Sequence, residues 1–141
     1  IQPLLDENGS NPSRITVYNL WRRFDVDGMD APFALCDSRT VSEKELIPTD
    51  LFNYGKEEEK TETLADENGF TVEIYQSMNS DNHKWYFYPK MNRDEVVMFK
   101  TYDSNENPFM PTLHSAFDDL SCDSKVSPRE SIEVRAICLF D

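Results

Sequence analysis

The chain has 141 residues, a length that suits a single domain over residues 1–141 with a core of its own. Asp and Glu outnumber Lys and Arg by 27 to 14, and the formal net charge is −13. Such a charge repels phosphate backbones and anionic bilayers, so we expect no binding to nucleic acid or to membranes. An aromatic content of 12% indicates a globular rather than a disordered chain.

The cysteines favour a reducing compartment. Cys36, Cys122 and Cys138 are an odd number without C-x-x-C spacing, which argues against a disulfide framework and against a zinc knuckle. No apolar run approaches the length of a membrane span, and no signal-peptide pattern is present. We therefore expect a cytoplasmic protein. Because the sequence starts at Ile1 rather than Met, we also expect it to be a piece of a longer chain.

The first element in chain order is a strand over residues 14–21. Its alternation places Ile15, Val17, Asn19 and Trp21 on one face and the intervening Thr, Tyr and Leu on the other. Large side chains on both faces predict a strand that is covered on both sides. Residues 22–32 contain glycine and proline and predict a surface loop.

Residues 33–36 form a short apolar run that is compatible with a second strand. Ser42 followed by Glu45 has the spacing of a capping box and predicts a short helical turn, which Pro48 ends. The acidic residues 55–69 predict a surface insertion, with a cation site as the alternative.

The second half of the chain reads as strands separated by turns. Residues 70–75 and 84–88 predict a β-hairpin, residues 96–102 a third strand in the same region, and residues 130–140 a final strand after a short one that contains His114. No internal repeat is visible. The sum is an all-β, mainly antiparallel sandwich or barrel with little helix.

A polar group of residues accompanies the last two strands. His114 is one of only two histidines, and His83 lies in a predicted turn. Arg129 and Ser131 share one face of the final strand, and an arginine fork suits a carboxylate better than a lysine does. Arg135 lies on the same face and needs an anion, which is a substrate, a cosubstrate or a neighbouring carboxylate such as Glu133. The opposite face, Ile132 to Phe140, is apolar and predicts packing.

Six sequence blocks carry a family resemblance from about residue 14 onward. They are Tyr18-Asn-Leu-Trp-Arg22, Ala34-Leu-Cys-Asp-Ser-Arg39, Lys84-Trp-Tyr-Phe-Tyr-Pro89, Met98-Phe-Lys-Thr-Tyr-Asp-Ser104, His114-Ser-Ala-Phe-Asp118 and Pro128-Arg-Glu-Ser-Ile-Glu-Val-Arg-Ala136. In this order they resemble the AsaB-like hydroxylase/desaturase family, which includes gibberellin desaturase-like and CmcJ-type cephamycin methoxylation proteins. The resemblance implies the C-terminal portion of a double-stranded β-helix (jelly-roll, cupin-like) oxygenase of fungal secondary metabolism.

The same resemblance implies iron(II) and 2-oxoglutarate as cofactors and a small-molecule metabolite as substrate. His114 would be one iron ligand, and Arg129 with Ser131 would hold the far carboxylate of 2-oxoglutarate. Asn19, Trp21, Tyr86, Tyr102 and Arg135 are possible pocket residues; no catalytic residue is assigned. Family members carry a His-x-Asp ligand pair upstream of the first block, and no histidine precedes His83 here.

Three hypotheses therefore stand side by side. The first is an oxygenase whose remaining iron ligands lie upstream, so that this stretch alone would be inactive. The second is a non-catalytic accessory or binding β-domain, with a partner protein in a biosynthetic pathway. The third is a structural or lectin-like sandwich in which His114 and Arg129 are surface residues.

Overall fold

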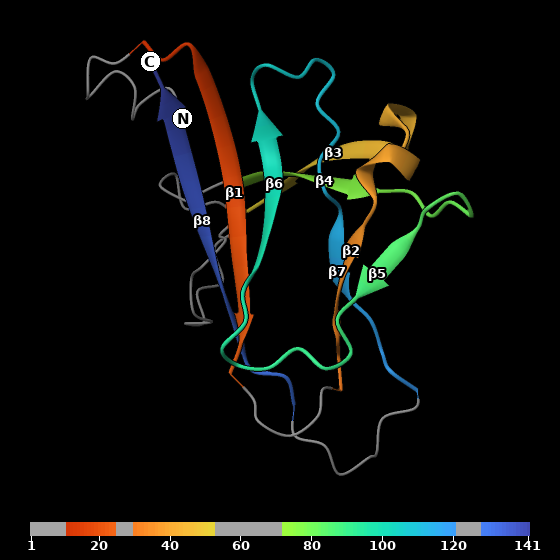
Figure 1. Ribbon diagram of the computed structural model, residues 1–141. Helices are drawn as coiled ribbons and strands as arrows, with labels where there is room; N and C mark the ends of the chain where they lie inside the picture. The colour runs from red at the N-terminus through yellow and green to blue at the C-terminus, as the bar shows by residue number, and fades with distance from the viewer. Residues whose placement is uncertain (1–10, 25–29, 53–71, 121–127) are drawn as a thin grey trace, which may run out of the picture. The chain divides into compact units, whose positions relative to one another are not determined.

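A computed structural model describes residues 11–24, 30–52, 72–120 and 128–141 (Figure 1). The strands are β1 (Arg14–Arg23), β2 (Phe33–Cys36), β3 (Leu46–Leu51), β4 (Val72–Ser77), β5 (Trp85–Phe87), β6 (Val97–Asp103), β7 (His114–Ala116) and β8 (Ser131–Phe140). Two short 3-10 helices, η1 (Ser38–Thr40) and η2 (Glu43–Glu45), are the helices of these ranges, and neither is long and apolar enough to cross a membrane. The mainly antiparallel, all-β prediction is confirmed.

The chain divides into two compact units. The larger comprises residues 1–41 and 82–141, and the smaller comprises residues 42–81. The single domain expected over residues 1–141 stays a prediction. The acidic insertion expected at residues 55–69 lies outside the described residues.

The larger unit contains a three-stranded antiparallel sheet in the order β6-β1-β8, called here the major sheet (Figure 1). β1 is its central strand and pairs along its whole length with β8, from Arg14 opposite Phe140 to Arg23 opposite Ser131. The pairing with β6 shifts register between Val17 and Tyr18. The predicted strand over residues 14–21 is confirmed, and it runs two residues further than expected.

Directly opposed residues of antiparallel strands point to the same face of a sheet. The face that carries Asn19 is called here the site face. Its rows across the sheet are Tyr102, Val17 and Ile137, then Phe99, Asn19 and Arg135, then Val97, Trp21 and Glu133, and finally Arg23 and Ser131. The opposite, outer face carries Met98, Leu20 and Val134 in one such row.

The site face is the covered one. Trp21, at 4% exposure, forms a core cluster with Phe33, Met91 and Phe99, against which Leu35 and Val97 pack. On the outer face Val134 is 54% exposed and Ile132 and Phe140 are exposed as well, whereas Thr16 and Asp103, at the end of the sheet, are fully buried. The expected packing of the apolar face of the final strand is therefore partial: Ala136 and Cys138 are half-buried, and Ile132, Val134 and Phe140 are exposed.

A second antiparallel sheet of the larger unit has the order β5-β2-β7, with β2 in the centre. Leu35 of β2 is opposite Tyr86 of β5 on one side and His114 of β7 on the other, so these three side chains share a face. β5 is fastened beside β2 because Thr40 Oγ1 accepts the Lys84 N–H at 3.1 Å and Lys84 O accepts the Asp37 N–H at 2.9 Å.

The predicted β-hairpin over residues 70–88 is wrong. β4 pairs with β3, from Leu46 opposite Ser77 to Leu51 opposite Val72, and β5 pairs with β2. The third strand expected beside the hairpin, β6, pairs with β1 instead. The turn residues near Asn79 end β4 as expected, but the strand that follows finds its partner in a segment about fifty residues earlier in the sequence.

The smaller unit consists of η2 and the two-stranded sheet of β3 and β4. The capping spacing was predicted correctly: Glu45 Oε2 accepts the Ser42 N–H at 2.8 Å. The helical turn ends at Glu45, before Pro48, which lies inside β3 opposite Tyr75. A two-stranded sheet has only edge strands, where a residue without an N–H is tolerated.

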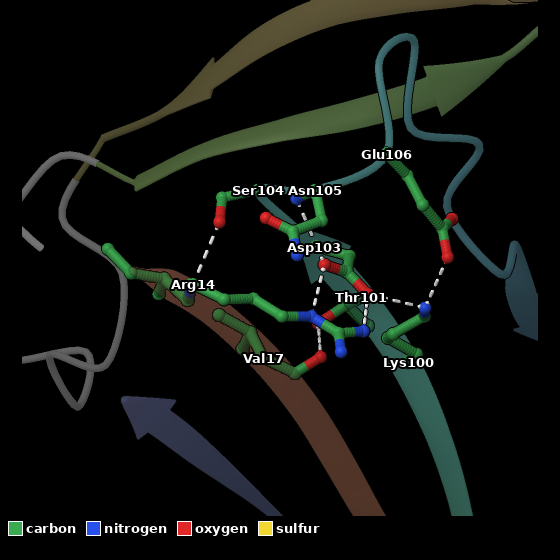
Figure 2. Close-up of polar contacts among 9 residues, drawn as sticks. Arg14, Val17, Lys100, Thr101, Asp103, Ser104, Asn105 and Glu106 are labelled. Carbon is green, nitrogen blue, oxygen red and sulfur yellow. Dashed lines mark hydrogen bonds and ion pairs between the residues drawn. The ribbon is translucent and has the colours of Figure 1, made fainter. Parts of the chain in front are cut away.

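An ion cluster closes the end of the major sheet where β6 finishes beside the start of β1 (Figure 2). The Asp103 side chain is fully buried and accepts hydrogen bonds from Arg14 Nε at 2.9 Å, Lys100 Nζ at 2.7 Å and the Asn105 N–H at 3.1 Å. These bonds, led by those from Arg14 and Lys100, lower the pKa of Asp103 below its ordinary value. Lys100 also binds Glu106 at 2.6 Å.

Candidate functional site

His114 opens β7 and is held by its neighbours on two sides. Its Nδ1 lies 3.1 Å from Thr112 O, and its ring centroid is 4.7 Å from that of Phe99 and 5.9 Å from that of Phe33. A proton on Nδ1 satisfies the Thr112 carbonyl and leaves the lone pair on Nε2. Metal-binding histidines are commonly oriented by such a bond to a backbone carbonyl. The geometry therefore suits His114 to act as a metal ligand through Nε2.

Arg129 precedes β8 and is tied to the loop before β2. Its backbone N–H donates to Asp30 Oδ1 at 2.9 Å, and its Nη1 donates to Ala31 O at 3.0 Å. Its Cζ lies 5.8 Å from the centre of a Trp21 ring, a distance typical of a cation–π contact. A half-buried guanidinium held in this way is preorganised for an anion.

The aromatic core joins these two residues. The rings of Trp21 and Phe33 stack with centroids 4.4 Å apart and planes 8° from parallel. Arg129 contacts the Trp21 end of this stack, and His114 contacts the Phe33 end. Residues fifteen positions apart in the sequence thus contact the same aromatic cluster, Arg129 through Trp21 and His114 through Phe33.

Ser131, the other residue expected near Arg129, begins β8 and is exposed. It lies opposite Arg23 on the site face. Arg23 is 6% exposed, and its Nη1 donates to Met91 O at 3.0 Å. Sequence reasoning missed Arg23, although the alternation of Asn19 and Trp21, continued by two residues, would have placed it on the same face.

Asn19 lies at the centre of a polar trio on the site face. The side chain is fully buried; its Nδ2 donates to Glu133 Oε1 at 2.7 Å, and its Oδ1 accepts from Arg135 Nε at 3.1 Å. Arg135 Nη2 is 4.0 Å from Glu133 Oε1. Arg135 is therefore ion-paired with Glu133, the internal carboxylate considered as its partner, and Asn19 forms hydrogen bonds with both residues.

The two tyrosines expected in the pocket lie on the two sheets. Tyr86 shares a face with His114 on the second sheet, and Tyr102 lies on the site face opposite Val17, where it packs edge-on against Phe109 at 6.2 Å. Both tyrosines are exposed. Tyr86 is thus on the same sheet and face as His114. Tyr102 is on the major sheet, in the row next to that of Asn19 and away from Trp21.

Metal-ligating side chains are sparse in the described ranges, where no group of three or more His, Cys, Asp or Glu residues is placed to hold an ion. His114 is accordingly a single candidate ligand there. Cys36 is buried and Cys138 half-buried, and neither forms a disulfide.

Comparisons with known proteins agree with these observations. Residues 4–139 match the model of a family described as an oxidoreductase/YMDC permease-like domain. The chain is 30% identical over 125 residues to the Fe(II)/2-oxoglutarate-dependent dioxygenase nvfI of Aspergillus novofumigatus, covering 89% of this chain and 41% of that protein. It is 29% identical over 132 residues to the hydroxylase/desaturase asaB of Aspergillus flavus, covering 92% of this chain and 57% of that protein.

The structural comparison extends over the same region. A solved structure of the iron and alpha-ketoglutarate-dependent endoperoxidase NvfI matches with a TM-score of 0.70 at 30% identity, covering 92% of this chain and 42% of that one. The resemblance to AsaB-like hydroxylase/desaturases and the double-stranded β-helix fold are thereby confirmed. The chain spans about half the length, or less, of the relatives it matches.

Proposed function

Because the chain belongs to the oxidoreductase/YMDC permease-like family, we propose that it forms part of an iron(II)/2-oxoglutarate-dependent oxygenase that hydroxylates or desaturates a small-molecule metabolite. Relatives from fungi named as dioxygenases and hydroxylase/desaturases support the reaction class. The single observation in this chain that carries the proposal is that Arg129 contacts Trp21 and His114 contacts Phe33, while the rings of Trp21 and Phe33 stack on each other.

In the proposal His114 contributes one of the iron ligands through Nε2. Thr112 O fixes the ring by accepting the Nδ1 proton, and Phe99 restricts its rotation. Iron and 2-oxoglutarate together supply the oxidising chemistry with dioxygen. The remaining ligands of a two-histidine, one-carboxylate site come from outside the described residues.

Arg129 binds the far carboxylate of 2-oxoglutarate in the proposed complex. Its Nη1 is anchored on Ala31 O and its plane rests near Trp21, so little side-chain freedom is lost on binding. Ser131 adds a hydroxyl donor from the same strand. The stacked rings of Trp21 and Phe33 add an apolar surface beside Arg129 and His114, which disfavours water next to the cosubstrate.

We place the protein in the cytoplasm, with a metabolite of secondary metabolism as its substrate. The unpaired thiols of Cys36 and Cys138 suit a reducing compartment. The acidic net charge disfavours nucleic acid as a partner.

Release of succinate from 2-oxoglutarate by the protein at full length tests this function. We expect release that requires added iron(II) and is lost in Arg129→Ala but retained in the surface control Arg39→Ala, whose side chain is 87% exposed. Binding of 2-oxoglutarate without succinate release in the presence of iron(II) would instead identify a non-catalytic accessory domain.

A further inference from the structure

The guanidinium of Arg135 is held in one orientation by a buried amide. Asn19 Oδ1 accepts from Arg135 Nε, while Asn19 Nδ2 donates to Glu133 Oε1. If the Asn19 amide were reversed, its NH2 group would face the Arg135 Nε–H and its oxygen would face the Glu133 carboxylate, so neither hydrogen bond could form. Asn19 is fully buried, so its amide needs partners within the protein, and Glu133 and Arg135 are those partners. The hydrogen bond to Asn19 fixes Arg135 through its Nε.

The Nη1 and Nη2 groups at the outer end of the Arg135 guanidinium donate no hydrogen bond to the described residues. Nη2 is 4.0 Å from Glu133 Oε1, too far for a hydrogen bond, and within the described ranges neither Nη group forms one. The side chain is 54% exposed. A guanidinium fixed at Nε and open at both Nη atoms presents the parallel pair of N–H groups that a carboxylate binds.

The position of Arg135 separates it from the proposed cosubstrate group. Arg135, Asn19 and Phe99 lie in one row across the major sheet, and the His114 ring packs on Phe99. Neighbouring strands are about 4.8 Å apart, so the backbone of Arg135 lies roughly 10 Å across the sheet from that of Phe99. Arg129, in contrast, is bound to Ala31 O beside Trp21. The two arginines thus have separate sets of contacts, Arg129 with Ala31 and Trp21 and Arg135 with Asn19 and Glu133.

We propose that Arg135, oriented by Asn19, binds a carboxylate of the organic substrate and positions that substrate relative to His114. That the bound acid is oxidised rests on the proposed function. That Arg135 binds a carboxylate is argued from the hydrogen bonds of Asn19, Glu133 and Arg135 alone. Glu133 is a positioning residue here, because it holds the Asn19 amide in the orientation that fixes Arg135. The substrate class is an organic acid with its reacting carbon several bonds away from the carboxylate.

The test compares 3-phenylpropanoate with its neutral amide, 3-phenylpropanamide, as probes of the full-length protein with and without 2-oxoglutarate. Guanidinium ¹⁵N–¹H NMR signals of Arg135 report contact, and titration gives Kd for each probe. A charge-assisted pair predicts that the acid binds roughly tenfold tighter than the amide. Arg135→Gln should abolish this preference, Arg135→Lys should restore part of it, and the control Arg39→Gln should leave it unchanged.

Three results would overturn the proposal. An acid preference that persists in Arg135→Gln would locate the carboxylate elsewhere. An Arg135→Gln variant that loses 2-oxoglutarate affinity as Arg129→Ala does would assign Arg135 to the cosubstrate. Unmoved Arg135 signals in the wild-type chain, a measurement independent of how the variants fold, would make the trio purely structural. Failure of the proposed function gives a different result, because 2-oxoglutarate then does not bind. The affinities of the acid and the amide can still be compared in the samples without 2-oxoglutarate.

Discussion

Replacing Arg129 with alanine should weaken 2-oxoglutarate binding far more than it weakens the fold. The guanidinium has one donor on Ala31 O and others available for a carboxylate. Two charge-assisted hydrogen bonds at about 1.5–3 kcal/mol each correspond to roughly 10²- to 10⁴-fold in Kd. Loss of the single bond to Ala31 should cost only about 1 kcal/mol of unfolding free energy, so the variant should remain folded.

Arg129→Lys separates charge from geometry. Lysine keeps the positive charge but cannot form the paired N–H donors of a guanidinium, so its Kd should fall between those of the wild type and the alanine variant. The surface variant Arg39→Ala removes an equally charged side chain from a solvent-exposed pair with Asp37 and should leave Kd unchanged.

The fluorescence of Trp21 can be used to measure 2-oxoglutarate binding. The chain has two tryptophans, and Trp21 is the one that Arg129 contacts. In a Trp85→Phe background, Trp21 is the one tryptophan left in these 141 residues, and the difference in fluorescence titration between this protein and its Trp21→Phe counterpart reports 2-oxoglutarate binding beside Arg129 and gives Kd. A Kd for Arg129→Ala within threefold of the wild-type value, in a variant with an unchanged unfolding transition, would refute the assignment of Arg129 to the cosubstrate.

Three further outcomes are expected. His114→Ala should abolish binding of cobalt(II), a spectroscopic substitute for iron(II), at the proposed site of the full-length protein, whereas the matched His83→Ala should retain it; equal loss in both variants would argue against His114 as a ligand. Asp103→Asn should lower the Tm by roughly 10 °C in calorimetry, because it leaves two cations beside a neutral buried group; an unchanged Tm would mean that the cluster adds no stability. The pKa of Asp103 and of Asp37 lies below the ordinary 3.8, that of Asp37 falling to about 2 through the hydrogen bond from Arg39. Their stabilisation should therefore be complete above about pH 4 and decline as the pH falls through the folded-state pKa values, and acid titration of Asp103→Asn should show a smaller decline than the wild type.

Strand alternation predicted much of the fold because it is a local property. The pattern that separates Asn19 and Trp21 from Leu20 survives in the structure, where the first two face the covered side. Strand pairing is not local. The hairpin prediction at residues 70–88 failed because Lys84, just before β5, is bound by the Asp37 backbone N–H and the Thr40 hydroxyl, and the residues around Asn79 carry no signal for that partner.

The site was predictable as a set of residue types but not as an arrangement. Arg129 and Ser131 were placed on one face by parity, yet the stack that brings Arg129 and His114 together depends on Phe33, which reads in the sequence as an ordinary core residue. Arg135 was correctly expected to need an anion, and the buried amide that holds it could be identified only from the register of β1 with β8.

The pairing of β1 with β8 also sets the order in which this molecule can assemble. The hydrogen bond from Arg135 to Asn19 joins residues 116 positions apart, and the whole ladder between these strands has similar separations. Contacts this distant in sequence close large loops before they contribute stability, which slows folding. During synthesis β1 can pair with β6 first, and its pairing with β8 becomes possible only after residues 131–140 have left the ribosome. The part of the site face that β8 contributes, including Arg135, should therefore form later in folding than the part built by β1 and β6.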